Sequence, residues 1–192
     1  MSEHRMAAIF FIPMEPDSVP PSLHDLVTRA GMDQLLPESG PVTKSLYGQT
    51  EVVFARWGVM ESVYAHRQIL AQHVCLQVFP HRNDLLDRQI IGNPEAAMPI
   101  AETFRDACVA LQPDAAMLYT GADQIEPEYL DAQYPFVLGL DGILLDESYS
   151  ALLYLNAEIA SYFPKAYHAG RDQLPAGDGL LLFRGTGDDR WA

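Results

Sequence analysis

Residues 99–120, PIAETFRDACVALQPDAAMLYT, decide the fold class of this 192-residue chain. The apolar residues of the first half recur at helical spacing and predict one long helix over 99–111: Ile100, Phe104, Ala107, Cys108 and Leu111. Pro99 suits the first turn of such a helix, and Pro113 ends it. The short apolar run at 115–120 then predicts a buried strand.

A second apolar run precedes the helix and predicts another strand. Residues 73–79, HVCLQVF, are apolar at most positions and are followed by Pro80. Strand, helix and strand in this order are typical of a right-handed βαβ crossover, which we expect here.

The N-terminal part of the chain predicts strands and one short helix. Residues 7–13 predict a buried strand, and Ser22 is placed to cap a helix that Gly31 ends. Residues 42–47 and 50–57 predict a hairpin with its turn at Gly48-Gln49. Both faces of the second run are apolar, so we expect this strand to be central in its sheet.

Other segments are ambiguous or less regular. Residues 61–71 weakly favour a helix, with Val63, His66 and Leu70 on one side. A second long helix is predicted to begin at 146–148 and to end at Pro164, although residues 151–155 could instead form a strand. Residues 135–140 and 179–184 predict two further strands.

These elements together predict an α+β fold. We expect a single compact domain over 1–184, with a polar C-terminal tail at 185–192. The domain should contain a mixed β-sheet of about five to seven strands, with two or three helices packed on it.

Composition and localisation signals favour a globular cytoplasmic protein. Apolar residues make up 48% of the chain and charged residues 20%, which is globular composition. The apolar run at 6–12 is short and lacks a small-residue cleavage site, and no run approaches the ~18 apolar residues of a membrane span. Cys75 and Cys108 lie in apolar surroundings and are expected to be buried free thiols.

The chemical motifs of common enzymes are absent from the sequence. There is no phosphate-binding P-loop, no hydrolase nucleophile elbow, and no zinc-binding H-E-x-x-H or C-x-x-C. His73 and Cys75 share a face of their predicted strand and could bind a metal, but their apolar neighbours favour simple burial. We therefore predict no catalytic residues, no metal and no cofactor.

The net charge of −14 is unevenly distributed along the chain. The 59 residues between Arg105 and Lys165 contain ten acidic side chains and no lysine or arginine. Residues 1–105 carry a net charge of −4, and residues 165–192 are neutral. A solvated face is one explanation, but a field of a single sign also steers an oppositely charged partner.

Aromatic residues lie among the acidic ones in the middle of this segment, as in many protein interfaces. The predicted partner-binding residues are Asp123, Glu126, Glu128, Tyr129, Asp131, Tyr134 and Asp141. The partner that fits them is a basic protein, while nucleic acid and anionic membranes would be repelled.

The leading hypothesis is a cytoplasmic protein that occludes a basic protein partner, as an immunity protein neutralises an effector toxin or nuclease. No motif matches a particular immunity family, so only size, acidity and the lack of catalytic motifs support this class. One alternative is an enzyme of unfamiliar type, with His66, His73 or His81 beside one of the carboxylates. Two others are a nucleic-acid mimic and a chaperone for a secreted effector.

Overall fold

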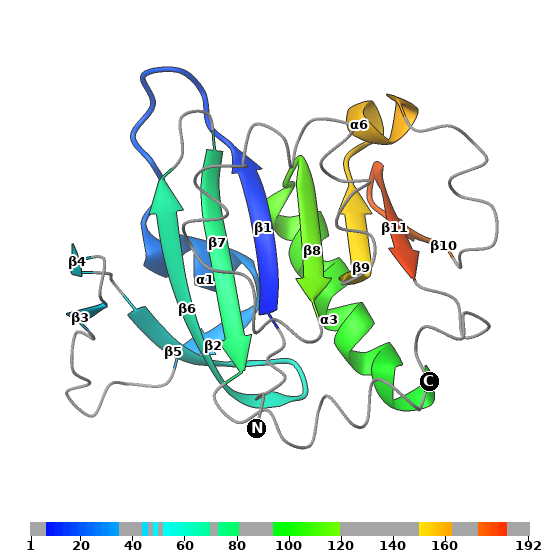
Figure 1. Cartoon of the computed structure of the whole chain (residues 1–192), viewed down its shortest axis with the longest axis horizontal. Coiled ribbons are helices and arrows are strands. Elements are labelled where there is room, and N and C mark those ends of the chain that lie inside the picture. The colour runs from blue at the N-terminus through cyan, green and yellow to red at the C-terminus, as the bar shows by residue number, and fades with distance from the viewer. Residues whose placement is uncertain are drawn as a thin grey trace.

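The computed structural model describes residues 7–34, 44–45, 48–49, 52–69, 73–80, 94–119, 150–162 and 173–183. Within them, nine strands form one sheet in the order β10-β11-β9-β8-β1-β7-β6-β5-β2, and every pairing is antiparallel. Three helices accompany the sheet, so the α+β class is confirmed (Figure 1). The predictions of a mixed sheet and of five to seven strands are wrong, because neighbouring strands alternate in direction, edge strands were missed and two interior strands were predicted as helix.

The central strands are the ones that the sequence marked most clearly. β1 (Ala7–Pro13) lies between β7 (His73–Pro80) and β8 (Ala115–Tyr119). Both neighbours run antiparallel to β1, so β7 and β8 are parallel to each other but not adjacent. The predicted strand–helix–strand order is therefore confirmed, but the first strand of the chain is inserted into the crossover.

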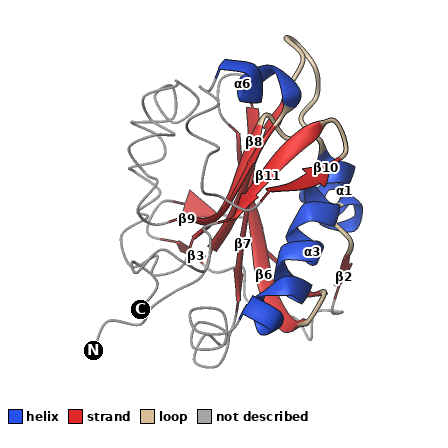
Figure 2. Cartoon of the chain, turned by 90° about the vertical axis from the view of Figure 1, so that its right-hand side faces the viewer, coloured by secondary structure: helices blue, strands red, loops and turns tan. Residues whose placement is uncertain are grey.

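Helices α1 (Leu23–Arg29) and α3 (Pro94–Leu111) cover one face of the sheet (Figure 2). The Ser22 hydroxyl accepts a hydrogen bond from the Asp25 amide at 3.1 Å, which confirms the predicted cap of α1. α3 begins at Pro94 rather than at Pro99, so Pro99 lies inside the helix. A proline is also well suited to this earlier start, because its missing N–H would have no partner in the first turn.

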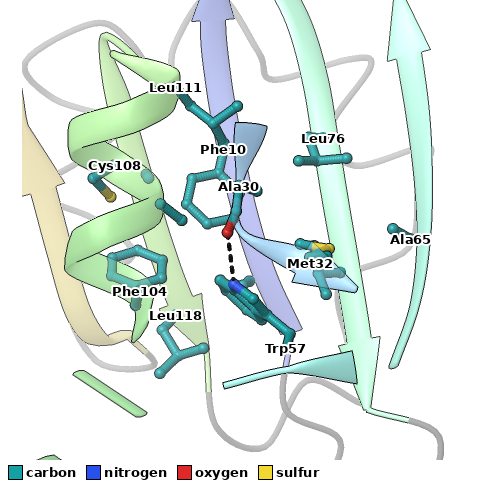
Figure 3. Close-up of a cluster of buried hydrophobic side chains, with 14 of the residues drawn as sticks. Phe10, Ala30, Met32, Trp57, Ala65, Leu76, Phe104, Cys108, Leu111 and Leu118 are labelled. Atoms are coloured by element: carbon teal, nitrogen blue, oxygen red, sulfur yellow. Dashed lines mark hydrogen bonds between the residues drawn. The ribbon is translucent and has the colours of Figure 1, made fainter. Parts of the chain in front are cut away.

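The core between the helices and the sheet is centred on an aromatic cluster (Figure 3). The Phe10 ring contacts Trp57 edge-on, with centroids 5.9 Å apart, and Phe104 of α3 at 5.2 Å. The buried Trp57 indole donates a hydrogen bond to the Ala30 carbonyl at 3.1 Å. Because Ala30 is the C-cap of α1, this bond fixes the end of that helix to the sheet.

Two predictions for the N-terminal half of the chain are wrong: the hairpin of residues 42–47 and 50–57, and the helix at 61–71. β5 (Val52–Trp57) pairs with β6 (Met60–Ile69) and with β2 (Met32–Gln34), one position from the sheet edge. Gly48-Gln49 forms the short strand β4, paired with β3 (Lys44–Ser45) in a separate ribbon, and not a turn. Residues 61–69 of the segment predicted as a helix belong to β6, whose side chains alternate between the two faces of the sheet, and residues 70–71 lie outside the described part of the chain.

The second long helix was also predicted incorrectly, and its strand alternative is confirmed. Residues Ser150–Leu155 form β9, and of the described residues in this segment, 150–162, Ala157–Tyr162 are helical, as α6. Both faces of β9 are buried, so its continuous apolar run has no helical or alternating pattern. β11 (Gly179–Phe183) agrees with the predicted last strand, while β10 (Gln173–Ala176) at the edge was missed.

Candidate functional site

The described residues bring together one polar cluster at the end of the sheet where α6 lies: His73, Asp114 and Asn156. His73 is the first residue of β7, Asp114 precedes β8, and Asn156 follows β9. β1 ends beside them, because Pro13 pairs with His73 (Figure 1). Four strand ends therefore meet at this cluster.

Asp114 is the hub of the cluster. One carboxylate oxygen lies 2.7 Å from His73 Nε2, and the other accepts a hydrogen bond from Asn156 Nδ2 at 2.7 Å. The Asp114 carbonyl accepts the Asn156 amide at 2.9 Å, and the Asp114 amide donates to the Phe11 carbonyl at 2.8 Å. Asp114 thus has contacts with three different strands.

Asn156 links this hub to α6. Its Oδ1 accepts the Ile159 amide at 2.8 Å, and its carbonyl accepts the Ala160 amide at 2.9 Å. Asn156 therefore caps the first turn of α6 while its amide group is held by Asp114. Glu158 in the same turn places a negative charge near the positive end of the helix.

The cluster is largely buried and its contacts are internal. The His73 side chain is 9% exposed and that of Asp114 is 26% exposed. A carboxylate beside an imidazole also orients the general base of many enzymes. In this chain Asp114 and Asn156 bind groups at strand ends and at a helix cap, so we assign these contacts a structural role. The enzyme alternative stays a prediction.

The other histidine and cysteine residues that the sequence singled out have different surroundings. His66 stacks on Phe79, with ring centroids 5.4 Å apart, and burial lowers its pKa. Cys75 is fully buried near Gln77, and burial raises the pKa of Cys108, so both are buried free thiols as expected. Among the described residues, no group of three or more histidine, cysteine or acidic side chains could hold a metal. His81 lies outside the described residues.

The seven predicted partner-binding residues lie outside the described residues, as do the strand predicted at 135–140 and the tail at 185–192. They are Asp123, Glu126, Glu128, Tyr129, Asp131, Tyr134 and Asp141. Of the ten acidic residues between Arg105 and Lys165, the structure describes three. Asp106 is exposed on α3, Glu158 is exposed on α6, and Asp114 is engaged with His73. These three residues belong to three different parts of the fold.

The two ends of the interval that contains the seven residues are adjacent in the sheet. Tyr119, the last residue of β8, pairs with Ser150, the first residue of β9, next to a register shift. Paired strands lie about 4.8 Å apart. The two residues that flank the interval 120–149 are therefore neighbours in the sheet, and the interval contains seven acidic residues and no lysine or arginine.

Comparisons with known proteins do not identify a family. No protein-family model and no curated protein matches the chain. Among solved structures, the T6SS protein PA0821 of Pseudomonas aeruginosa is similar with a TM-score of 0.48 and 13% sequence identity. The similarity covers 95% of this chain and 65% of that one, so this chain spans just under two thirds of that protein's length. A similarity of this size identifies neither a family nor an activity.

In the described part of the chain, no helix has both the length and the apolar character needed to cross a membrane.

Proposed function

We propose that this chain is a cytoplasmic binding protein that occludes a basic protein partner, in the manner of an immunity protein that neutralises an effector toxin. The interval 120–149 would supply the binding surface. The observation that supports this proposal is the pairing of Tyr119 with Ser150, because it brings together the two ends of an interval whose charged residues are all acidic.

The charge distribution supports a basic partner. Half of the net charge of −14 comes from the seven acidic residues of the interval, since it contains no basic residue. Charges of one sign repel each other, so their concentration costs free energy unless an opposite charge compensates it. A basic protein would supply that compensation and would associate faster through electrostatic steering.

Asp114 is not part of the proposed surface. Its carboxylate is already hydrogen-bonded to His73 and Asn156, so it contributes to the fold rather than to an external contact. The proposal therefore rests on the acidic residues of the interval and their aromatic neighbours Tyr129 and Tyr134.

The decisive experiment replaces residues 120–149 by Asn-Gly, a two-residue turn suited to joining antiparallel strands. Wild type and variant are used as bait in extracts of the source organism, and captured proteins are identified by mass spectrometry. We expect wild type to capture one basic protein reproducibly at low salt, and the variant to capture none. Circular dichroism and thermal unfolding check that the variant has folded.

A full-length pair of variants tests the same proposal without removing the interval. Glu126→Lys/Glu128→Lys should reduce capture and slow association, because it places two positive charges on the proposed surface. The matched control, Glu61→Lys/Glu102→Lys, changes the net charge equally at exposed positions of β6 and α3 and should bind as wild type. Equal binding by both double variants, or no reproducible partner for wild type, would contradict the proposal.

A further inference from the structure

We propose that His73, Asp114 and Asn156 form a latch that fastens the C-terminal unit of the fold to the rest of the sheet. The C-terminal unit is defined as β9, α6, β10 and β11. It is continuous in sequence order and occupies one edge of the sheet, so its backbone meets the remaining strands only where β9 pairs with β8 among the described residues.

The geometry makes Asp114 the point of attachment. Asp114 precedes β8, and both its carbonyl and its carboxylate hold Asn156 at the end of β9, at 2.9 and 2.7 Å. The second carboxylate oxygen contacts His73 of β7, two strands away from β8. The attachment therefore spans β7, β8 and β9 rather than a single strand pair.

The latch also extends into α6. Asn156 holds the first turn of the helix through Ile159 and Ala160, so a shift of Asn156 removes the cap. α6 has only six residues, and so short a helix has little stability without its cap and its packing. Loss of the Asp114 contacts should consequently loosen β9 and α6 together.

Local opening of this kind is energetically separable from global unfolding. Proteins open in contiguous cooperative units, and a unit at a sheet edge breaks fewer pairings than a central strand does. β1, by contrast, is paired on both sides and is buried at every position from Ala8 to Ile12. We infer that the C-terminal unit opens before the central strands, and that the latch sets how often it does so.

Native-state hydrogen exchange on the full chain tests the proposal. Asp114→Asn should accelerate exchange of the Asn156, Ile159 and Ala160 amides by roughly tenfold, as expected for a lost charged hydrogen bond. Amides in the β1–β7 ladder should exchange as in wild type. The control Asp106→Asn removes the same charge from the exposed side of α3 and should change neither set.

Two further variants keep the test decisive if Asp114→Asn does not fold. His73→Phe lies far from α6 in sequence, keeps an aromatic ring and cannot donate to Asp114, so faster exchange in α6 would demonstrate coupling across the strands. Asn156→Ser preserves a capping hydroxyl but loses the amide that Asp114 binds, so the amides of residue 156, Ile159 and Ala160 should exchange faster, as in Asp114→Asn. Uniform acceleration at all amides, or unchanged exchange in the C-terminal unit, would overturn the latch.

The latch requires no binding partner, so its test is independent of the proposed function. Ser150 nevertheless belongs to β9, and it is one of the two ends of the interval 120–149. If the latch holds and no basic partner is found, only the proposed function fails.

Discussion

At the scale of single residues, burial and hydrogen bonding shift the pKa values of particular side chains. Burial raises the pKa of Tyr154 to about 12, with smaller contributions from Cys108, Asp178 and Asp114. For Asp25 the largest effect is the hydrogen bond from the Ser22 hydroxyl, which lowers the pKa of the carboxyl. Asp25 thereby stays charged near the N-terminus of α1, where a negative charge stabilises the helix.

The lowered pKa of His66 predicts that the folded protein loses stability in mild acid. Its pKa is lowered by burial in the folded state, whereas the unfolded side chain titrates near pH ~6.5. Below that pH the unfolded chain binds a proton that the folded chain resists, so the free energy of unfolding falls as the pH drops. Urea unfolding at pH 7, 6 and 5 should therefore show a shallower decline for His66→Gln than for wild type.

A substitution that removes no titratable group provides the control for this measurement. Thr28→Ala, at an exposed position of α1, should keep the wild-type pH dependence. An identical decline in wild type and His66→Gln would show that His66 does not contribute to it.

The buried hydrogen bond of Trp57 predicts that even a conservative substitution at this position lowers the free energy of unfolding substantially. Trp57→Phe retains an aromatic ring but removes the indole donor and leaves the Ala30 carbonyl without this partner. The lost hydrogen bond and the cavity together should lower the free energy of unfolding by about 2 kcal/mol or more. Urea denaturation should show a lower midpoint with an unchanged m-value, and a change below ~0.5 kcal/mol would contradict this reasoning.

At the scale of elements, the turn between β5 and β6 is fitted closely to α3. Gly58 has a φ of 56°, a left-handed conformation that other residues adopt at a cost. A Cβ at this position would overlap the side chain of Thr103 on α3. The hairpin and the helix can approach each other here only because residue 58 is glycine.

This contact predicts a non-additive pair of substitutions. Gly58→Ala should destabilise the protein by about 2 kcal/mol, from backbone strain and from the overlap with Thr103. Thr103→Ala in the same chain should recover the part due to overlap but not the part due to strain. A double-mutant cycle measures the difference, and strictly additive effects would contradict the predicted overlap.

Helices and strands were predicted correctly from the sequence where their apolar residues followed one clear period. The prediction failed where a strand is buried on both faces of the sheet. The stripe from Ile100 to Leu111 and the apolar run of β1 were found, because helical spacing and short apolar runs are distinctive. β9 was taken for part of a helix because a strand buried on both faces has no alternation to recognise. β6 was ambiguous for a related reason, since half-buried residues such as His66 blur its pattern.

The polar cluster could be predicted only in part. His73 was a candidate beside some carboxylate, but sequence spacing gives no distance, and Asp114 lies 41 residues away. Asn156 was missed because the predicted helix ran through it. Asparagine directly before Ala157-Glu158 is a helix-start signal and could have placed the end of β9 correctly.

At the scale of the whole molecule, the net charge of −14 governs how stability responds to salt. Added salt screens repulsion between exposed charges of the same sign, with a Debye length near 10 Å at 0.1 M. The melting temperature of wild type should rise when sodium chloride is increased from 20 to 200 mM. The variant with Asn-Gly in place of 120–149 loses seven acidic residues, its net charge becomes −14 + 7 = −7, and its melting temperature should rise less.

A comparison with sucrose, an uncharged solute, separates the screening of charges from the other effects of added salt. Sucrose at matched osmolality should stabilise wild type and variant to the same extent, because it does not act through charge. An equal response of the two proteins to sodium chloride would contradict a significant repulsive contribution from the interval.

The adjacency of Tyr119 and Ser150 also has an evolutionary consequence. A segment whose two ends lie on paired strands can change in length while the pairing of those ends stays the same, because closing a longer segment costs little additional free energy. Changes in the length or composition of 120–149 can therefore leave the pairing of Tyr119 with Ser150 unaltered. A chain built in this way can follow changes in a binding partner without first having to solve its folding problem again.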